Sequence, residues 1–229
     1  MGRETDEKPV SRPTLGSKTI TAYTLAVIVP FSNQFRRDLP ALYAELVRRL
    51  PGSLGKKFDS TVFGTTGAPG GNFDQLGGAP AMVVDATDTF KDVAGVLNAV
   101  AAGGNDLTHW VASPALHGLL LTATDQLGRQ FFISDPASQS SVGSVFGAPV
   151  VKTRGTLPGA TTGYAGDFAN AAVWGSVEGV QISVSDQATL TDGDDTINLW
   201  QRNMFAVRAE IEVGFRVKDL NAFVRINGA

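Results

Sequence analysis

The sequence predicts a mixed α+β fold, in which helices and strands follow one another without the regular repeat of a parallel sheet. Two observations carry this prediction. Residues 205–217 have an apolar residue at every odd position and mostly charged residues between them, which is the period of a half-buried strand. Residues 42–62 instead repeat apolar residues every three or four positions, which is the period of a helix.

The alternating stretch predicts an unusually long strand. Thirteen residues at about 3.3 Å each would span about 43 Å, whereas strands are typically about five or six residues long. The intervening positions carry charges of both signs, and a long strand with such a face is expected in a protein that contacts copies of itself. The charged positions are Arg208, Glu210, Glu212, Arg216 and Lys218.

The first third of the chain predicts an arm, a strand, a long helix and a loop. Residues 1–17 are polar with two prolines, and residues 18–31 are rich in strand formers. A helical pattern then starts at Ser32 and runs to Val62 through Leu42, Leu46 and Leu50, with a kink or break expected near Pro51. The glycine-rich residues 64–78 predict a loop at a boundary between two subdomains.

The remaining elements are shorter. Asp88 or Thr87 can cap a helix that Gly103 ends, and Pro114 suits the first turn of a second helix. The predicted helices are 87–102 and 114–124; the predicted strands are 109–112, 131–133, 149–153, 168–174 and 180–184; residues 153–163 are a predicted loop and 192–195 a predicted turn.

Composition excludes several classes of protein. The net charge of −3 does not suit a nucleic-acid binder, and the absence of cysteine excludes disulfides and thiolate metal sites. No apolar run is long enough to span a bilayer, and the polar first residues do not form a secretory signal, so a cytoplasmic origin is expected. The few charged residues and many glycines indicate turns and surface buried against partners.

Motifs for catalysis, metal binding or cofactor binding are not found. The only histidines, His109 and His117, have no carboxylate at a useful spacing, so we expect structural or surface roles. Asp192, Asp194 and Asp195 loosely resemble a calcium loop but lack its further ligands, which favours a solvated turn. The sequence contains no GxSxG, no phosphate-binding GxxxxGK[ST] and no GxGxxG that opens a helix. We therefore predict a protein that is not an enzyme and has no cofactor.

Five segments, in this order, resemble the major capsid proteins of tailed phages with the HK97-type shell fold, and together they cover nearly the whole chain. The segments are Glu7-Lys8-Pro9 with the strand that ends at residues 29–32, the helix 42–63 with its glycine-rich exit, residues 110–114 with 125–129, residues 147–151, and residues 166–168 before the closing 203–226.

The resemblance implies an architecture. A peripheral domain, residues 32–78 and 175–212, would hold a spine helix and a long β-ribbon, and an axial α/β subdomain would comprise 79–174 and 213–229. Residues 1–31 would be the remnant of an extended loop that rests on a neighbouring subunit, in a chain that lacks the family's N-terminal arm. Because these residues bury little apolar surface, we expect them to be mobile in an isolated subunit and ordered only against a neighbour.

The resemblance also implies a candidate crosslink. Crosslinking members of the family join a loop lysine to an asparagine, helped by a glutamate seven residues later. Asn203 and Glu210 match that spacing; Lys18 is the candidate lysine and Lys8 the alternative. In members that do not crosslink, the same asparagine and glutamate only form hydrogen bonds, and both alternatives stay open.

The function implied is that of a structural major capsid protein, or a large fragment of one, that assembles as hexamers and pentamers into an icosahedral shell around phage DNA. We expect no sequence-specific DNA contact and no membrane contact. Scaffold, portal and decoration proteins are further expected partners. Assembly would occur in the bacterial cytoplasm, and the product would be the virion capsid.

The alternatives are an encapsulin-type shell around an enzyme cargo and a small α+β enzyme. The predicted contacts between subunits are Arg208, Glu212, Arg216 and Lys218.

Overall fold

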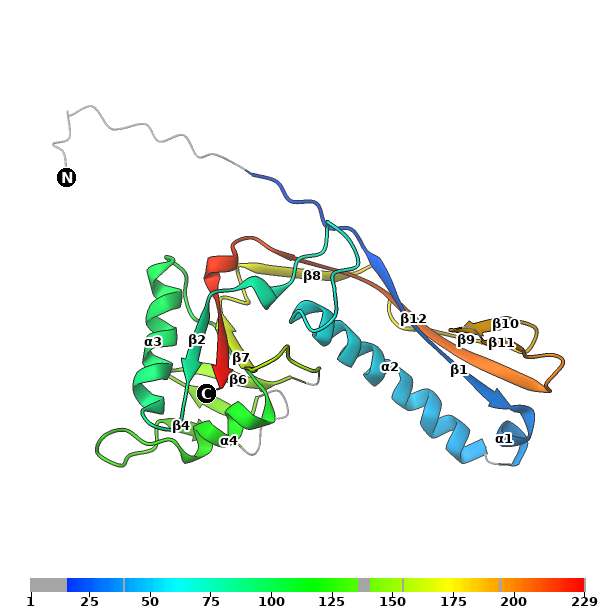
Figure 1. Ribbon diagram of the computed structural model, residues 1–229, viewed down its shortest axis with the longest axis horizontal. Helices are drawn as coiled ribbons and strands as arrows, with labels where there is room; N and C mark the ends of the chain where they lie inside the picture. Colours follow the sequence, from blue (N-terminus) through cyan, green and yellow to red (C-terminus); the bar gives the residue numbers. More distant parts are fainter. Residues whose placement is uncertain (1–15, 39, 136–140, 154, 194, 229) are drawn as a thin grey trace.

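The computed structural model describes residues 16–228 except 39, 136–140, 154 and 194. Figure 1 shows a long arm, made of strands and one long helix, joined at one end to a body that is built on a second sheet. The side chains of Leu42 and Leu46, and the whole of Glu7-Lys8-Pro9 with the alternative crosslinking residue Lys8, lie outside the described part of the chain.

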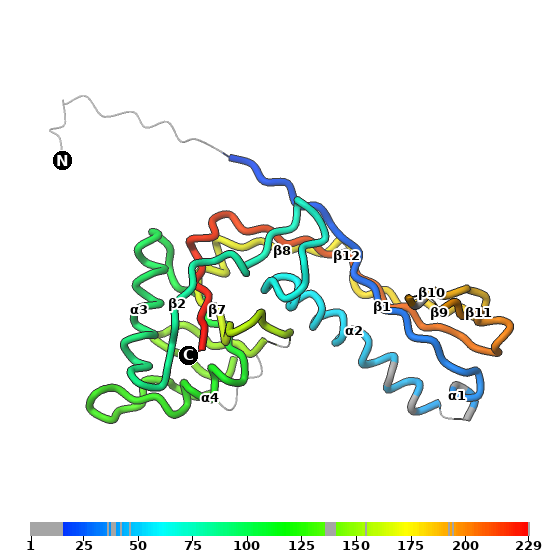
Figure 2. The backbone as a smooth tube through the Cα atoms, in the orientation of Figure 1, coloured from blue at the N-terminus to red at the C-terminus, as the bar shows by residue number. Residues whose placement is uncertain are grey.

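The arm is organised by one strand, β12 (Met204–Val217). It pairs antiparallel with β1 (Tyr23–Ser32) along one edge, and with β8 (Ala172–Ser176) and β9 (Gln181–Ser185) in succession along the other. A small hairpin of β10 (Thr189–Asp192) and β11 (Asp195–Asn198) follows β9 at the outer end of the arm (Figure 2). The predicted long strand is therefore confirmed, and it is the central strand of its sheet.

The odd-numbered face of β12 packs on the long helix α2 (Pro40–Val62). Phe205, Val207 and Ala209 are each at most 1% exposed and form one apolar cluster with Leu50 and Leu54 of the helix. Alternation along the strand therefore has the expected cause: alternate side chains point to opposite faces, and one face is covered by α2. The prediction that the odd positions pack on the spine helix is confirmed for this half of the strand.

Pro51 lies inside α2, and the helix is continuous through it, so the predicted break is not formed. Proline has no N–H to donate to the carbonyl of Val47, which costs the helix one hydrogen bond. Leu50 and Leu54 flank the proline and are both buried against the sheet. Their tertiary packing keeps both turns of the helix in place. A separate short helix, α1 (Asn33–Asp38), precedes α2.

The body contains a seven-stranded sheet in the order β2-β13-β7-β3-β6-β5-β4. Two of its strand pairs are parallel and the others antiparallel, and helices lie against it, which confirms the α+β class. The strands are β2 (Ala81–Val84), β3 (His109–Ala112), β4 (Phe132–Ser134), β5 (Gly143–Val145), β6 (Ala148–Lys152), β7 (Thr161–Gly166) and β13 (Phe223–Gly228).

Two helices of the body begin close to their predicted starts, the first at the predicted cap Asp88 and the second with Pro114 in its first turn. The Asp88 carboxylate accepts a hydrogen bond from the Lys91 N–H at the start of α3 (Thr89–Ala102), and the Ser113 hydroxyl accepts one from the Leu116 N–H at the start of α4 (Pro114–Thr122). Their buried residues share one core with the sheet. That core includes Val93, Val96, Val100, Trp110, Leu116 and Leu120. Two short 3-10 helices, Leu76–Gly78 and Leu220–Ala222, complete the elements.

The predicted strand 168–174 is wrong at its beginning. The Asp167 carboxylate accepts hydrogen bonds from the backbone and side-chain N–H groups of Asn170, which fixes a turn. The extended backbone therefore starts only at Ala172, in β8.

Arm and body are joined through a buried tyrosine. The Tyr164 hydroxyl on β7 donates a hydrogen bond to the Phe63 carbonyl, just past the end of α2, at 2.8 Å. The two rings stack with their centroids 5.0 Å apart. Burial raises the pKa of Tyr164 to about 12, so its hydroxyl keeps the donated proton. Phe215 of β12 belongs to the same cluster, and the joint is consequently a continuation of the core.

Residues 23–31 lie in the sheet of their own subunit, which favours order without a neighbour over the mobility expected from the sequence. All ten residues of β1 are in register with β12 of the same subunit, and Leu25, Val27 and Val29 pack with the cluster under α2. The residues just before β1 cross the outer face of the sheet at Gly214, where a Cβ would collide with the side chain of Ile20.

Substitution on the two faces of β12 should have opposite effects on stability. Val207→Asp places an unpaired charge at a fully buried position and should lower the free energy of unfolding by about 3 kcal/mol or more. Arg208→Asp, at a side chain that is 49% exposed, should change it little. Thermal melting of both variants measures the difference, and equal losses would contradict the assignment of faces.

Hydrogen exchange tests the placement of β1. Since β1 is hydrogen-bonded to β12 of its own subunit, the amides of β1 that face β12 should be protected in the isolated, unassembled chain. Fast exchange throughout residues 23–32 in the monomer, followed by protection on assembly, would show instead that the strand is ordered by a neighbour.

Candidate functional site

The predicted contact residues lie on the face of the arm that α2 does not cover. Arg208 is half exposed; its guanidinium forms an ion pair with Glu210 at 3.1 Å and donates a hydrogen bond to the Ser183 hydroxyl on β9 at 3.2 Å. Glu212, further along the same face, is exposed. This face therefore presents both signs of charge to solvent near the middle of the ribbon.

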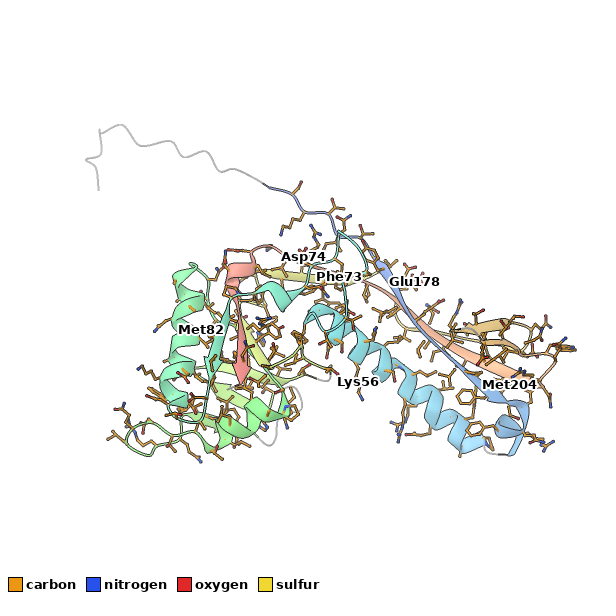
Figure 3. All side chains as sticks on the ribbon, viewed as in Figure 1. Lys56, Phe73, Asp74, Met82, Glu178 and Met204 are labelled. Carbon is orange, nitrogen blue, oxygen red and sulfur yellow. The ribbon has the colours of Figure 1, made fainter. Side chains whose placement is uncertain are left out.

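Arg216 has its partners inside the subunit. Its side chain is only 15% exposed. The guanidinium donates to the Gly71 carbonyl at 3.0 Å and lies 3.4 Å from the Asp74 carboxylate. Asp74 also accepts the Val217 N–H at 2.9 Å. Arg216 thus fastens the glycine-rich loop to the end of β12 (Figure 3 labels Asp74 there).

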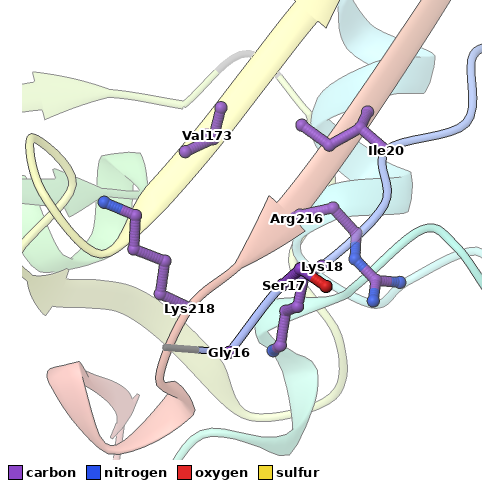
Figure 4. A pocket seen from close by; sticks show the side chains of 7 residues that line it. All are labelled: Gly16, Ser17, Lys18, Ile20, Val173, Arg216 and Lys218. Atoms are coloured by element: carbon purple, nitrogen blue, oxygen red, sulfur yellow. The ribbon is translucent and has the colours of Figure 1, made fainter. Parts of the chain in front are cut away.

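A cavity of about 510 Å³ lies beside this end of β12 (Figure 4). Lys18 lines it; its ammonium donates to the Val217 carbonyl at 2.5 Å and lies 3.9 Å from Asp74. Three cationic side chains therefore surround a space with one nearby carboxylate, which suits an anionic group but supplies no acid–base pair. The complete lining is Gly16, Ser17, Lys18, Ile20, Val173, Arg216 and Lys218.

The candidate crosslinking residues are not brought together within one subunit. Asn203 immediately precedes β12, whereas Lys18 contacts its last residue, so the whole 14-residue strand separates them. Asn203 adopts a left-handed backbone (φ 52°) and accepts hydrogen bonds from the side chain and the backbone N–H of Asn33. Glu210 pairs with Arg208. Within the subunit Asn203 is hydrogen-bonded and Glu210 is ion-paired, and a crosslink, which needs a second subunit, stays a prediction.

The histidines and the acidic turn form no catalytic or metal centre in the part of the chain that the structure describes. His109 lies edge-on to Phe168. Burial, with a smaller effect from Lys152, lowers the pKa of His117. Asp192 pairs with Asp195 at the end of the β10–β11 hairpin and Gly193 has a left-handed backbone, which agrees with the turn predicted there. Over the described residues no group of three His, Asp or Glu could hold a metal ion, and no helix is long and apolar enough to cross a membrane.

Exposed apolar side chains on the arm are the functional feature that sequence reasoning missed. Trp174 is 66% exposed, Trp200 70% and Val184 47%. Alternation in residues 180–184 indicated a strand with a buried face, but α2 covers only the β1–β12 half of the sheet. An apolar groove of about 290 Å³ runs between α2 and the uncovered half; it is lined by Pro51, Leu54, Gly55, Phe58, Trp174, Val180, Ile211, Val213 and Phe215.

Comparison with known proteins shows which family has a similar sequence. Residues 1–228 match the phage capsid family. The probable major capsid protein gp17 of Mycobacterium phage D29 is 30% identical over an alignment of 240 residues, which covers 97% of this chain and 74% of the relative. Its counterpart in Mycobacterium phage L5 is 30% identical over 241 residues, with the same coverage of both chains.

Solved structures agree in fold. A chain from Gordonia phage Cozz superimposes with a TM-score of 0.77 at 22% identity, covering all of this chain and 77% of that one. A capsid chain of an empty GTA particle gives a TM-score of 0.66 at 15% identity, covering all of this chain and 80% of that one. These neighbours confirm the predicted HK97-like fold.

The family match confirms a structural role and the prediction that the chain is not an enzyme. Nothing in these comparisons supports the encapsulin alternative. Capsid proteins of this kind self-assemble into a shell of capsomers and are part of the virion. The chain belongs to the phage capsid family, and it is a structural protein of the capsid shell.

Proposed function

We propose that this chain assembles as hexamers and pentamers into an icosahedral shell that encloses phage DNA without sequence-specific contact, in the cytoplasm of a bacterial host. The observation that carries the proposal is the arm. The face of the arm that α2 covers is packed within its own subunit. Among the described strands β1 and β9 each pair only with β12, so each has one unpaired edge. Unpaired strand edges are ready contact surfaces for another chain. Scaffold, portal and decoration proteins are further partners within this proposal.

We also propose the division into a peripheral and an axial domain. All strands of the seven-stranded sheet fall within residues 79–174 and 213–229, which supports the proposed axial domain. The helix α2 and most of the ribbon fall within 32–78 and 175–212. The pairing of β1 adds residues 23–31 to the peripheral domain, which leaves residues 1–22 as the proposed remnant of the extended loop.

The polar face of the ribbon is the proposed contact between subunits, with Arg208, Glu212 and Lys218 as its exposed members and Arg216 supporting them from within. Each exposed pair contributes under about 1 kcal/mol, but the contact repeats at every subunit of a shell. For Asn203 and Glu210 we favour a hydrogen-bonding role over a crosslink with Lys18, because Asn33 and Arg208 already engage them.

Charge reversal on this face should impair assembly more than folding. Arg208→Glu and Glu212→Arg, made separately, should each lower the fraction of protein in shells, seen by electron microscopy and sedimentation, because both create like-charge contacts. Melting temperatures should stay within about 2 °C of the parent, since surface substitutions are usually worth about 0.5 kcal/mol or less.

Arg208→Lys and Glu212→Asp, which keep the sign of the charge, are the matched controls and should assemble normally. Unaltered shells from both reversed variants would refute the assignment of this face. Failure of the parent chain to form any shell would refute the proposed function itself.

A further inference from the structure

The sequence distributes charge unevenly between two segments of the chain. Residues 155–201 contain no Lys or Arg; their acidic residues are Asp167, Glu178, Asp186, Asp192, Asp194 and Asp195. Residues 36–57, by contrast, carry Arg36, Arg37, Arg48, Arg49, Lys56 and Lys57 against Asp38 and Glu45. A chain with a net charge of only −3 therefore has one strongly acidic and one strongly basic segment.

The part of the acidic segment that follows β8 lies along the β9–β11 side of the arm, whereas β7 and Asp167 belong to the body. Glu178, Asp186 and Asp195 are exposed on the arm, and among the described residues none of them forms an ion pair. Figure 3 shows Glu178 on this side of the ribbon. We call Glu178, Asp186 and Asp195 the acidic edge.

The basic segment forms one face of α2. Arg48 and Arg49 are 75% and 73% exposed, and Lys56 and Lys57 are exposed. At the spacing of a helix Arg48, Arg49 and Lys56 lie away from Leu50 and Leu54, which are packed against the sheet. Lys57, seven residues after Leu50, lies instead on the packed side, and its ammonium donates a hydrogen bond to the Thr66 hydroxyl. We call Arg48, Arg49 and Lys56 the basic face.

One carboxylate in the subunit neutralises part of the basic face. Glu45 accepts hydrogen bonds from both Arg48 and Arg49, at 2.8 and 2.7 Å. Side-chain hydrogen bonds from these two arginines lower the pKa of Glu45 to about 2, so it stays ionised. Three cations therefore share this side of α2 with two carboxylates, Glu45 and Asp59, and the remaining positive charge has to be balanced by solvent ions or by another molecule.

The two surfaces cannot neutralise each other in one subunit. The basic face points away from the sheet, and Lys56 and Glu178 lie on opposite sides of the arm (Figure 3). Among the described residues no ion pair joins the acidic edge to the basic face. Complementary charges that are held apart in one subunit can meet between two.

We propose that the acidic edge of one copy docks against the basic face of α2 in the next copy, head to tail. This inference rests on the proposed function and names the partner surfaces. Because the two surfaces differ, each bound pair leaves one acidic edge and one basic face free. A contact of this heterologous kind continues from copy to copy and closes into a ring when the rotation allows.

Apolar side chains beside both surfaces supply the desolvated part of such a contact. Ile182 and Val184 of β9, next to the acidic edge, are 43% and 47% exposed. Gly55, the sequence neighbour of Lys56, lines the apolar groove beside α2. Apolar cores ringed by charge are typical of specific interfaces, while the charges set the orientation and the rate of association.

The experiment uses two complementary variants of the full chain. Arg49→Glu/Lys56→Glu gives both surfaces a net negative charge, and Asp186→Lys/Asp195→Lys gives both a net positive charge. Each variant alone should assemble at least about tenfold less than the parent, measured by sedimentation, because every contact then joins like charges. An equimolar mixture should recover assembly to within about twofold of the parent, since alternating copies restore opposite charges at each contact.

A chain that carries all four substitutions is the second test, since both surfaces are inverted together and it should assemble alone. Circular dichroism melting controls for folding at these exposed positions. Normal assembly of either double variant alone would overturn the inference, as would a mixture that assembles no better than its components. Loss of DNA retention without loss of assembly in Arg49→Glu/Lys56→Glu would overturn it as well, and would show that the basic face binds nucleic acid. If the parent chain itself forms no shell, the proposed function fails instead.

Discussion

The structure of the arm depends on the burial of one face of β12. Phe205, Val207 and Ala209 are enclosed by α2 on that face, and Phe215 and Val217 continue it into the junction with the body. This single strand is paired on both edges and leads directly to β13 in the body's sheet. Loss of its buried face should therefore loosen α2, β1 and the joint together, because residues of β12 belong to the apolar clusters that hold all three.

Because only one face of β12 is buried in the subunit, the side chains on its other face can contact other molecules. On the outer face of β12, Arg208 and Glu210 pair in solvent, and Gly214 allows the chain before β1 to cross closely. Exposed tryptophans and unpaired edges are costly in a protein that stays alone, since they invite association. In a shell protein the same features are surfaces that assembly covers. Folding and assembly thus rely on separate sets of side chains of the same ribbon.

Elements with a clear period were predictable from the sequence, and elements without one were not. β12, α2, α3 and α4 each repeat apolar residues over nine or more residues, which is enough to define a face. Strands β2, β5 and β7 have three to six residues, too few to establish a period. The place of β1 was misjudged because its partner strand lies some 180 residues away and local sequence does not reveal such pairing.

The candidate surfaces were predictable in their residues but not in their geometry. Mixed charge at Arg208 and Glu212 follows from alternation alone. The internal role of Arg216 does not, because its partners Gly71 and Asp74 come from a distant loop. Uneven charge was present in the sequence, yet only the fold places the basic face and the acidic edge on opposite sides. Family membership was recognisable because the order of several weak motifs is more specific than any one of them.

The most direct test of this account is hydroxyl-radical footprinting of the isolated subunit and of the assembled shell. Side chains that fold the subunit, such as Phe205 and Trp110, are at most 1% exposed and should resist oxidation in both states. Trp174 and Trp200, which are 66% and 70% exposed, should be oxidised readily in the subunit and become protected in the shell. Ready oxidation of Phe205 in a folded subunit, or equal oxidation of both tryptophans in the two states, would contradict the separation of folding and assembly surfaces.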